Sequence, residues 1–311
     1  MAHAQSSAEQ TPSGQDSTTT AFLAAVGSFL LWGLVAPVYF KQLSHVGAVE
    51  VVSHRIVWTV LLVGAAVLAM RGPTAIVTAI GTWRRLGILV VTTALVTTNW
   101  TVFIWAVSHN RVVETSLGYF INPLVNVVLG VLFLRETLKP IQIAAVLIAA
   151  VGVGSMVLSS GVFPWVSISL ALSFGFYALV RKKAAVDPVV GLLVETALLA
   201  PLSLGYLLWL GADGAFGHSA GGSLLLVLSG PMTAIPLVLF MIGAARLKLS
   251  TLGLLQYIGP TGSLFLGAVI YGEPFTTTHL IAFGCIWLAL ALYSASTVSS
   301  HRAASRAAAA E

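Results

Sequence analysis

Long apolar stretches follow one another along almost the whole chain, separated by short polar or Gly/Pro-rich joints. A helix needs roughly 20 apolar residues to cross about 30 Å of hydrocarbon, and ten segments have that length. They centre on residues 21–40, 47–70, 86–108, 112–134, 140–159, 163–180, 189–210, 222–244, 249–271 and 277–297. The pattern predicts an all-α membrane protein with ten transmembrane helices.

The composition agrees with this pattern. Hydrophobic residues make up 58% and charged residues 8% of the 311 residues, and the mean hydropathy is +0.96. Soluble domains average about 25% charged residues, so a water-soluble globular fold is excluded. The single cysteine, Cys285, excludes an intramolecular disulfide and a Cys-based zinc cluster.

The basic residues fall mainly on one side of the predicted bilayer. That side carries Arg71, Arg84, Arg85, Arg135, Lys139, Arg181, Lys182, Lys183, Arg246, Lys248, Arg302 and Arg306. The other side carries Lys41 and Arg111. Because Lys and Arg accumulate in cytoplasmic loops, both termini are predicted to be cytoplasmic. The net charge of +5 is interpreted in the same way, and not as a nucleic-acid-binding surface.

A short motif recurs about 137 residues further along the chain. Asn122-Pro123 is followed by Glu136, and Gly259-Pro260 is followed by Glu273, with the same spacing from proline to glutamate. The recurrence predicts two similar halves of five helices. Since five is odd, the halves insert in opposite orientations, as in many secondary transporters that bind substrate near the membrane midplane.

The predicted organisation follows from this repeat. The first half covers residues 21–160 and the second covers residues 161–298. Residues 1–20 and 299–311 are polar or Ala-rich and are predicted to be disordered cytoplasmic tails.

Prolines within the apolar segments mark a candidate cavity. Proline removes a backbone hydrogen bond, and in lipid the freed carbonyl must find a partner or line a cavity. Pro37, Pro123, Pro236 and Pro260 are predicted helix kinks; the alternative is that they are only structural bends. The residues expected to line the cavity are His54, Arg55, Asn99, Trp100, Tyr119, Asn122, Tyr177, Gln256 and Tyr257. For Trp100 and Tyr177, core packing is an equal alternative.

Three ionisable residues are predicted to gate or couple transport. Arg55 lies about 12 Å below the predicted outer face, where it could bind an anionic substrate group, act as a gate or pair with Glu114. Glu195 lies in the predicted inner half, where it could couple transport to protons or pair with a cytoplasmic basic residue. Their depths differ by roughly 9 Å, so Arg55 and Glu195 are not expected to pair.

Enzyme signatures are missing from the sequence. It contains no HExxH, Walker A or GxSxG motif, and its aspartates lie outside the apolar segments. We therefore expect no catalytic site, metal site or cofactor, and any transport would depend on a gradient or on exchange.

Several strings point to one family. The first half contains Leu31-Trp32-Gly33, His54-Arg55, Asn99-Trp100 and Gly118-Tyr119-Phe120-Ile121-Asn122-Pro123. The second contains Ser173-Phe174-Gly175-Phe176-Tyr177, Glu195-Thr196 and Gln256-Tyr257-Ile258. Together they resemble the RarD family, in the EamA-like group of the drug/metabolite transporter superfamily. The resemblance covers about residues 22–297 and implies ten helices, an inverted repeat, a plasma (inner) membrane location and permease activity.

The sequence therefore predicts a secondary transporter that works by alternating access. By analogy with the superfamily, its substrates are small organic metabolites or drugs, among them amino acids. The alternative is a non-transporting membrane scaffold or sensor, and a channel is a third possibility. The lipid bilayer and a small organic solute are the expected partners; a homodimer is compatible with the sequence.

Overall fold

The computed structural model describes residues 14–109, 111–159, 161, 163–184, 186–272 and 276–308, and every regular element among them is a helix. Glu273 lies outside these residues. The first half contains α1 (Gly14–Leu30), the π-helical turn η1 (Leu31–Val35), α2 (Ala36–Gln42), α3 (Ala48–Arg71), α4 (Pro73–Ile80), α5 (Trp83–Ser108), α6 (Val112–Leu134) and α7 (Pro140–Ser159). The second contains α8 (Trp165–Ala184), α9 (Pro188–Leu210), the 3₁₀ turn η2 (Gly211–Asp213), α10 (Ala220–Arg246), α11 (Leu249–Leu255), α12 (Ile258–Phe265), the π-helical turn η3 (Leu266–Ile270) and α13 (Thr277–Ala308).

The described residues form 9 helical spans that are long and apolar enough to cross a membrane. The prediction of an all-α membrane protein is confirmed. The remaining predicted crossing coincides with α8, which has 20 residues but carries Arg181, Lys182 and Lys183 in its last turn. These three charges lower its hydropathy, and the count of ten crossings stays a prediction.

Three helical segments differ from the prediction. Helix α1 begins at Gly14, and α13 continues to Ala308, so residues 14–20 and 299–308 are not the disordered tails that were predicted. Extending an existing helix is easier than nucleating a new one, and alanine is the best helix former. Helix α4 was not predicted; it lies between the second and third spans.

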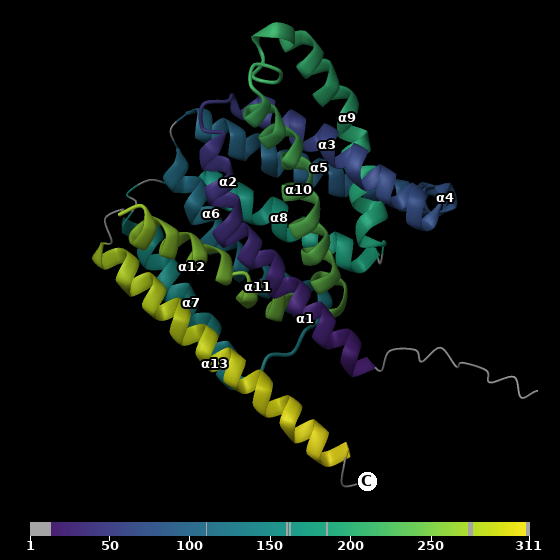
Figure 1. Cartoon of the computed structure of the whole chain (residues 1–311). Coiled ribbons are helices and arrows are strands. Elements are labelled where there is room, and N and C mark those ends of the chain that lie inside the picture. The colour runs from purple at the N-terminus through teal and green to yellow at the C-terminus, as the bar shows by residue number, and fades with distance from the viewer. Residues whose placement is uncertain are drawn as a thin grey trace, which may run out of the picture.

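Helices of the two predicted halves pack mainly against each other. The closest pairs are α7 with α13, α6 with α8, α3 with α9, α1 with α10, α3 with α10, α5 with α8 and α6 with α11. We count α1 to α2 as the first span and α11 to η3 as the ninth. Replacing each span with the one five places along the chain leaves α7–α13, α3–α9 and α6–α11 unchanged and exchanges α1–α10 with α5–α8. The same shift turns α6–α8 into η1–α12 and α3–α10 into α5–α9, and both of these pairs are also in contact. The start of α1 and the end of α13 lie at the same end of the bundle, and α7 and α13 run side by side along one edge (Figure 1).

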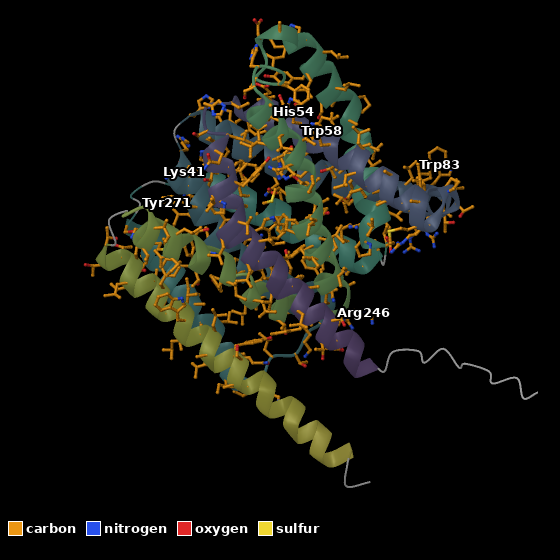
Figure 2. All side chains as sticks on the ribbon, in the orientation of Figure 1. Lys41, His54, Trp58, Trp83, Arg246 and Tyr271 are labelled. Atoms are coloured by element: carbon orange, nitrogen blue, oxygen red, sulfur yellow. The ribbon has the colours of Figure 1, made fainter. Side chains whose placement is uncertain are left out.

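The first and ninth spans are interrupted and touch each other. η1 interrupts the first span, and the ninth breaks between Leu255 and Ile258 before it ends in η3. A Cβ added at Gly33 would overlap the backbone of Gly259, so the first and ninth spans meet backbone to backbone. At the opposite end from Arg246, Lys41 Nζ lies 3.3 Å from the centre of the Tyr271 ring (Figure 2).

The four predicted kink prolines occupy two kinds of position. Pro37 and Pro260 each follow an interruption of their span: Pro37 lies just after η1 in the continuous helical run Thr18–Gln42, and Pro260 lies in the first turn of α12. Pro123 and Pro236 lie inside α6 and α10, which continue through them. The ninth span breaks at Gln256 and Tyr257, four and three residues before Pro260, where the missing N–H and the ring of that proline act.

Candidate functional site

Arg55 lies within α3, seven residues after the first residue of that helix, or about 10 Å along its axis. Its Nε donates a hydrogen bond to Thr233 Oγ1 of α10 at 2.9 Å. Thr233 is buried and donates in turn to the Ser229 carbonyl at 2.8 Å. The contact fixes one edge of the guanidinium and leaves its terminal nitrogens for another partner.

Aromatic rings surround this guanidinium. Its Cζ lies 5.2 Å from the centre of the Phe40 ring and 5.4 Å from that of Trp100. Tyr39 and Tyr119 lie close enough to interact with it electrostatically, and Tyr119 is 55% exposed. Among the described residues, no acidic side chain forms an ion pair with Arg55. The Arg55 site, made of these residues and Thr233, offers a ligand one cation and several ring faces.

Of the alternatives that the sequence left open for Arg55, an ion pair with Glu114 is not formed among the described residues. Glu114 Oε1 instead pairs with Arg111 Nη1 at 3.3 Å. The two residues are three positions apart at the start of α6, and side chains at that spacing share one helix face. Arg111 also lies over the rings of Trp105 and Trp165, at 5.5 and 5.8 Å. One oxygen of the Glu114 carboxylate is therefore paired locally, while Oε2 is buried without a hydrogen-bond partner among the described residues.

Glu195 on α9 is 1% exposed and is held by three side chains of other helices. Thr92 of α5 donates to Oε1 at 2.6 Å, and Tyr177 of α8 donates to Oε2 at 3.0 Å. Arg181, one turn after Tyr177, places Nε 3.6 Å from Oε1. Of the alternatives that the sequence left open, the structure shows the ion pair with a basic residue.

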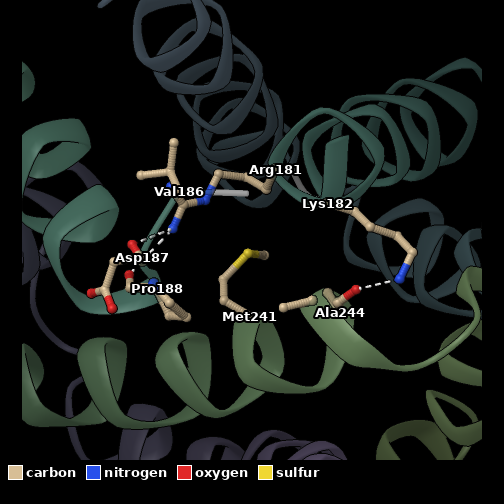
Figure 3. A pocket seen from close by; sticks show the side chains of 8 residues that line it. Arg181, Lys182, Val186, Asp187, Pro188, Met241 and Ala244 are labelled. Carbon is tan, nitrogen blue, oxygen red and sulfur yellow. Dashed lines mark hydrogen bonds between the residues drawn. The ribbon is translucent and has the colours of Figure 1, made fainter. Parts of the chain in front are cut away.

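Arg181 borders a pocket of about 190 Å³ at the end of α8. Its lining comes from α8 and the segment after it (Arg181, Lys182, Asp187) and from α10 (Met241, Ala244, Ala245) (Figure 3). Arg181 Nη2 donates to the carbonyls of Asp187 and Pro188 at 3.5 and 3.2 Å. Its Nε and Nη1 are buried without a hydrogen-bond partner among the described residues.

Asp187 closes this region by joining three helices. Its Oδ1 accepts hydrogen bonds from the amides of Val189 and Val190 at 3.0 Å each and so caps α9. Its Oδ2 pairs with Arg71 at the end of α3. Burial opposes ionisation, but the hydrogen bonds and charge of Arg71 together with the two amides lower the pKa of Asp187 below its usual value.

Asn122 and Gln256, both predicted to line the cavity, bond to each other where α6 crosses α11. Gln256 Nε2 donates to Asn122 Oδ1 at 2.5 Å, and Asn126 Nδ2 donates to Gln256 Oε1 at 2.8 Å. Asn122 Nδ2 donates to the Ala171 carbonyl of α8 at 2.7 Å. All three amides are buried, so in this structure they join the two motif-bearing spans.

Asn99 and Tyr257 also lie in packed surroundings. Asn99 Nδ2 donates to the Leu170 carbonyl of α8 at 2.9 Å. Tyr257 is fully buried and donates to the Phe120 carbonyl at 3.2 Å. Neither contacts Arg55.

His54 points away from Arg55, as their adjacent positions on α3 require. Its ring stacks on Phe216, with centres 5.2 Å apart, and its Nδ1 accepts from Trp58 Nε1 at 3.2 Å. His54 and Trp58 lie together near the loop that precedes α10 (Figure 2). Of the predicted cavity residues, Arg55, Trp100 and Tyr119 come together at one site; Tyr177 joins Glu195.

A layer of aromatic rings separates the Arg55 site from the Arg181 pocket. It consists of Phe29, Trp32, Phe174 and Phe240, with ring centres 5.2–6.0 Å apart for the Trp32–Phe240, Trp32–Phe174 and Phe174–Phe240 pairs. Along α10, Phe240 lies about 10 Å beyond Thr233, and Ala244 of the pocket lies about 16 Å beyond it. The aromatic layer therefore stands between the two arginines.

Sequence reasoning missed four residues of these sites: Tyr39, Phe40, Thr92 and Thr233. Arg181 was counted only as a loop charge. Its spacing of four from Tyr177 places both side chains on one face of α8, and that signal could have joined Arg181 to Glu195.

Comparisons with known proteins agree on one family. The sequence profile of the EamA-like transporter family matches residues 19–158. An "Uncharacterized transporter" of Vibrio cholerae is 44% identical over 301 residues, covering 96% of this chain and 99% of that protein. The "Protein RarD" of Escherichia coli is 39% identical over 293 residues, covering 93% and 98%.

Two further relatives widen the comparison. A "Chloramphenicol-sensitive protein RarD" of Pseudomonas aeruginosa is 34% identical over 265 residues, covering 82% of this chain and 87% of that protein. A protein of known crystal structure superposes with a TM-score of 0.69 at 20% identity, covering 88% of this chain and 97% of its own. At that identity the likeness shows the fold alone.

Proposed function

This chain belongs to the EamA-like transporter family, in its RarD group, and from this premise we propose that it is a secondary transporter that moves a small organic solute by alternating access. Membership makes it a membrane transporter. The residues that bind the solute and the way the protein opens and closes are our proposal.

The unpaired cation of Arg55 carries the proposal. A charged side chain within a membrane span is costly unless it is paired or faces water. Arg55 has a hydroxyl and aromatic rings as neighbours, and it forms no ion pair with a carboxylate of the described residues. An anionic group on the solute would complete the pairing, and an apolar or planar body would stack on Trp100 and Phe40. We therefore assign an organic anion, such as an amino acid carboxylate, as the preferred solute class.

The aromatic layer supports alternating access. Along α10 it lies between the depths of the Arg55 site and the Arg181 pocket, while Tyr119 of the Arg55 site is exposed. This combination fits a conformation open on the predicted outer side and closed towards the inner side. Opening the inner side would separate Trp32 from Phe240 and move α1 relative to α10.

The helix contacts support a division into residues 21–160 and 161–298 that rock against each other. The span pairs with the most extensive contacts are returned by a shift of five spans, as expected for two related halves. The family profile covers residues 19–158, close to the proposed first half. From the loop charges we also propose an inner-membrane location with both termini cytoplasmic.

Uptake by purified protein in proteoliposomes tests this function. The solutes are amino acids, other organic carboxylates and drug-like amines, each measured with and without a pH gradient. We expect saturable flux of an anionic solute, reduced at least about tenfold by Arg55→Gln, which removes a charge-assisted hydrogen bond. Arg84→Gln, an exposed change of the same charge, should leave flux intact. Folded protein without saturable flux of any solute would favour the scaffold or sensor alternative.

A further inference from the structure

The Arg181–Glu195 ion pair is incomplete. The Nε–Oε1 distance of 3.6 Å is too long for a strong hydrogen bond. The Arg181 side chain is 2% exposed, and two of its nitrogens have no hydrogen-bond acceptor among the described residues. A buried donor without an acceptor is destabilising, so Arg181 retains the capacity to bind a second anion.

The pocket beside Arg181 has the volume and lining to hold that second anion. Its volume of about 190 Å³ exceeds the room that a single water needs. Met241, Ala244 and Ala245 give it one apolar wall, and Arg181 and Lys182 contribute cationic side chains to the other (Figure 3). Asp187 also lines the pocket, and its carboxylate is paired with Arg71. Lys182 Nζ already donates to the carbonyls of Ala244 and Leu247, at 2.7 and 2.5 Å. Arg181 is therefore the group left to bind an anion.

The surroundings of Glu195 can accommodate a proton. Its partners are Thr92 on α5 and Tyr177 and Arg181 on α8; within the described residues, the other helices packed on α9 add no ionisable side chain to its contacts. Both hydroxyls can accept as well as donate a hydrogen bond. A protonated Glu195 could thus donate to either hydroxyl and keep both contacts.

We propose that this pocket is an inner binding site for a small organic carboxylate, which takes Arg181 from Glu195 and thereby causes Glu195 to take up one proton. A buried carboxylate that loses its cation is strongly destabilised. The proton comes from bulk water through the pocket and binds a Glu195 oxygen, so the net charge of the buried cluster is unchanged. The proposal rests on the proposed function for the identity of the ligand as a transported solute.

Binding measured by calorimetry tests this site without any need for transport. The full-length protein in nanodiscs is titrated at pH 7 with benzoate, and with benzamide as a neutral analogue of the same shape. Each titration is repeated in phosphate and in Tris, whose ionisation heats differ, so that the proton count can be extracted. We expect benzoate and not benzamide to bind, and the benzoate binding that depends on Arg181 to take up about one proton per anion.

Four variants separate the parts of the proposal. Glu195→Gln should bind benzoate without proton uptake, and Arg181→Gln should weaken binding at least about tenfold. Ala245→Phe should block the pocket without changing a charge, which keeps the test valid if Arg181→Gln does not fold. Lys183→Gln, a charge change in the same turn but outside the pocket lining, is the matched control and should bind like the unmodified protein.

Arg55→Gln distinguishes this site from the Arg55 site. It should reduce transport at least about tenfold yet leave proton-linked benzoate binding unchanged. The inner site would be overturned if the unmodified protein did not bind benzoate or bound it without proton uptake. It would also be overturned if neither Arg181→Gln nor Ala245→Phe changed benzoate binding. In each case the proposed function would still stand.

Discussion

The position of the Arg181 guanidinium depends on a glycine of the next helix. A Cβ at Gly191 of α9 would lie 2.5 Å from Arg181 Cζ and would overlap Nη1. Only hydrogen at position 191 lets the guanidinium lie between Glu195 and the carbonyls that follow α8. Gly205, on the same helix, has nothing within 4 Å of its added Cβ.

At the residue scale, Gly191→Ala should therefore displace Arg181 and destabilise the protein by about 1–3 kcal/mol, the range for a buried polar group left unpaired. Thermal unfolding of the purified variant in detergent measures the change. Gly205→Ala is the matched control and should be neutral or slightly stabilising, since alanine favours helix. Equal melting temperatures for the two variants would contradict the assigned role of Gly191.

The residue scale is also where sequence and structure differ most. Arg55 and Glu195 were identified because charges inside apolar segments are costly wherever they lie. Their partners were not, because pairing depends on the rotation of each helix and on which helices touch. Glu114 was one of the alternatives for Arg55 because of its depth, but Glu114 pairs with Arg111 on its own helix.

At the element scale, apolar length predicted the spans, and four prolines were predicted as kinks, but the sequence did not show which of those prolines would accompany an interrupted helix. Pro123 leaves α6 continuous, while the ninth span breaks at Gln256, which bonds to Asn122 and Asn126 of α6. The interruption thus coincides with contacts made by a neighbouring helix, which a single apolar segment does not reveal. Helix α4 is eight residues long and too short for its pattern to stand out.

The start of α9 gives a prediction for the dependence of stability on pH. The lowered pKa of Asp187 means that its cap and its pairing with Arg71 stabilise the fold fully above the pKa of an unfolded aspartate, about 3.9. This stabilisation is lost as the pH falls through the lower, folded-state pKa. The melting temperature of the unmodified protein should therefore exceed that of Asp187→Asn by a constant margin above about pH 5.

Below that pH the margin should shrink as Asp187 becomes protonated. Asp213→Asn, in the exposed turn η2, is the control and should show the same pH profile as the unmodified protein. A margin that persists unchanged to low pH would show that the charge of Asp187 contributes nothing.

At the scale of the whole molecule, the open question is whether α8 crosses the membrane. Five predicted spans separate residue 84 from residue 218, so Arg84 and His218 should lie on opposite sides. Without a crossing by α8 they would lie on the same side. Cysteines replacing these two exposed residues, one at a time in a Cys285→Ala background, report their sides directly.

We expect a membrane-impermeant maleimide to label Cys at position 218 in intact cells and at position 84 only in inverted vesicles. Labelling of both positions from one side would remove α8 from the spans. Labelling with the sides exchanged would reverse the orientation that the loop charges predict.

Synthesis makes Arg55 long before its partner. Thr233 lies 178 residues later in the chain, and at 5–20 residues per second roughly 10–35 s separate the two at the ribosome. During that interval α3 carries an arginine whose hydrogen-bond acceptor has not yet been made. A lone charge in hydrocarbon is drawn towards the interface. We therefore expect α3 to stay near water or the insertion machinery until α10 has been synthesised. The helices of the bundle then cannot pack in the order in which they are made.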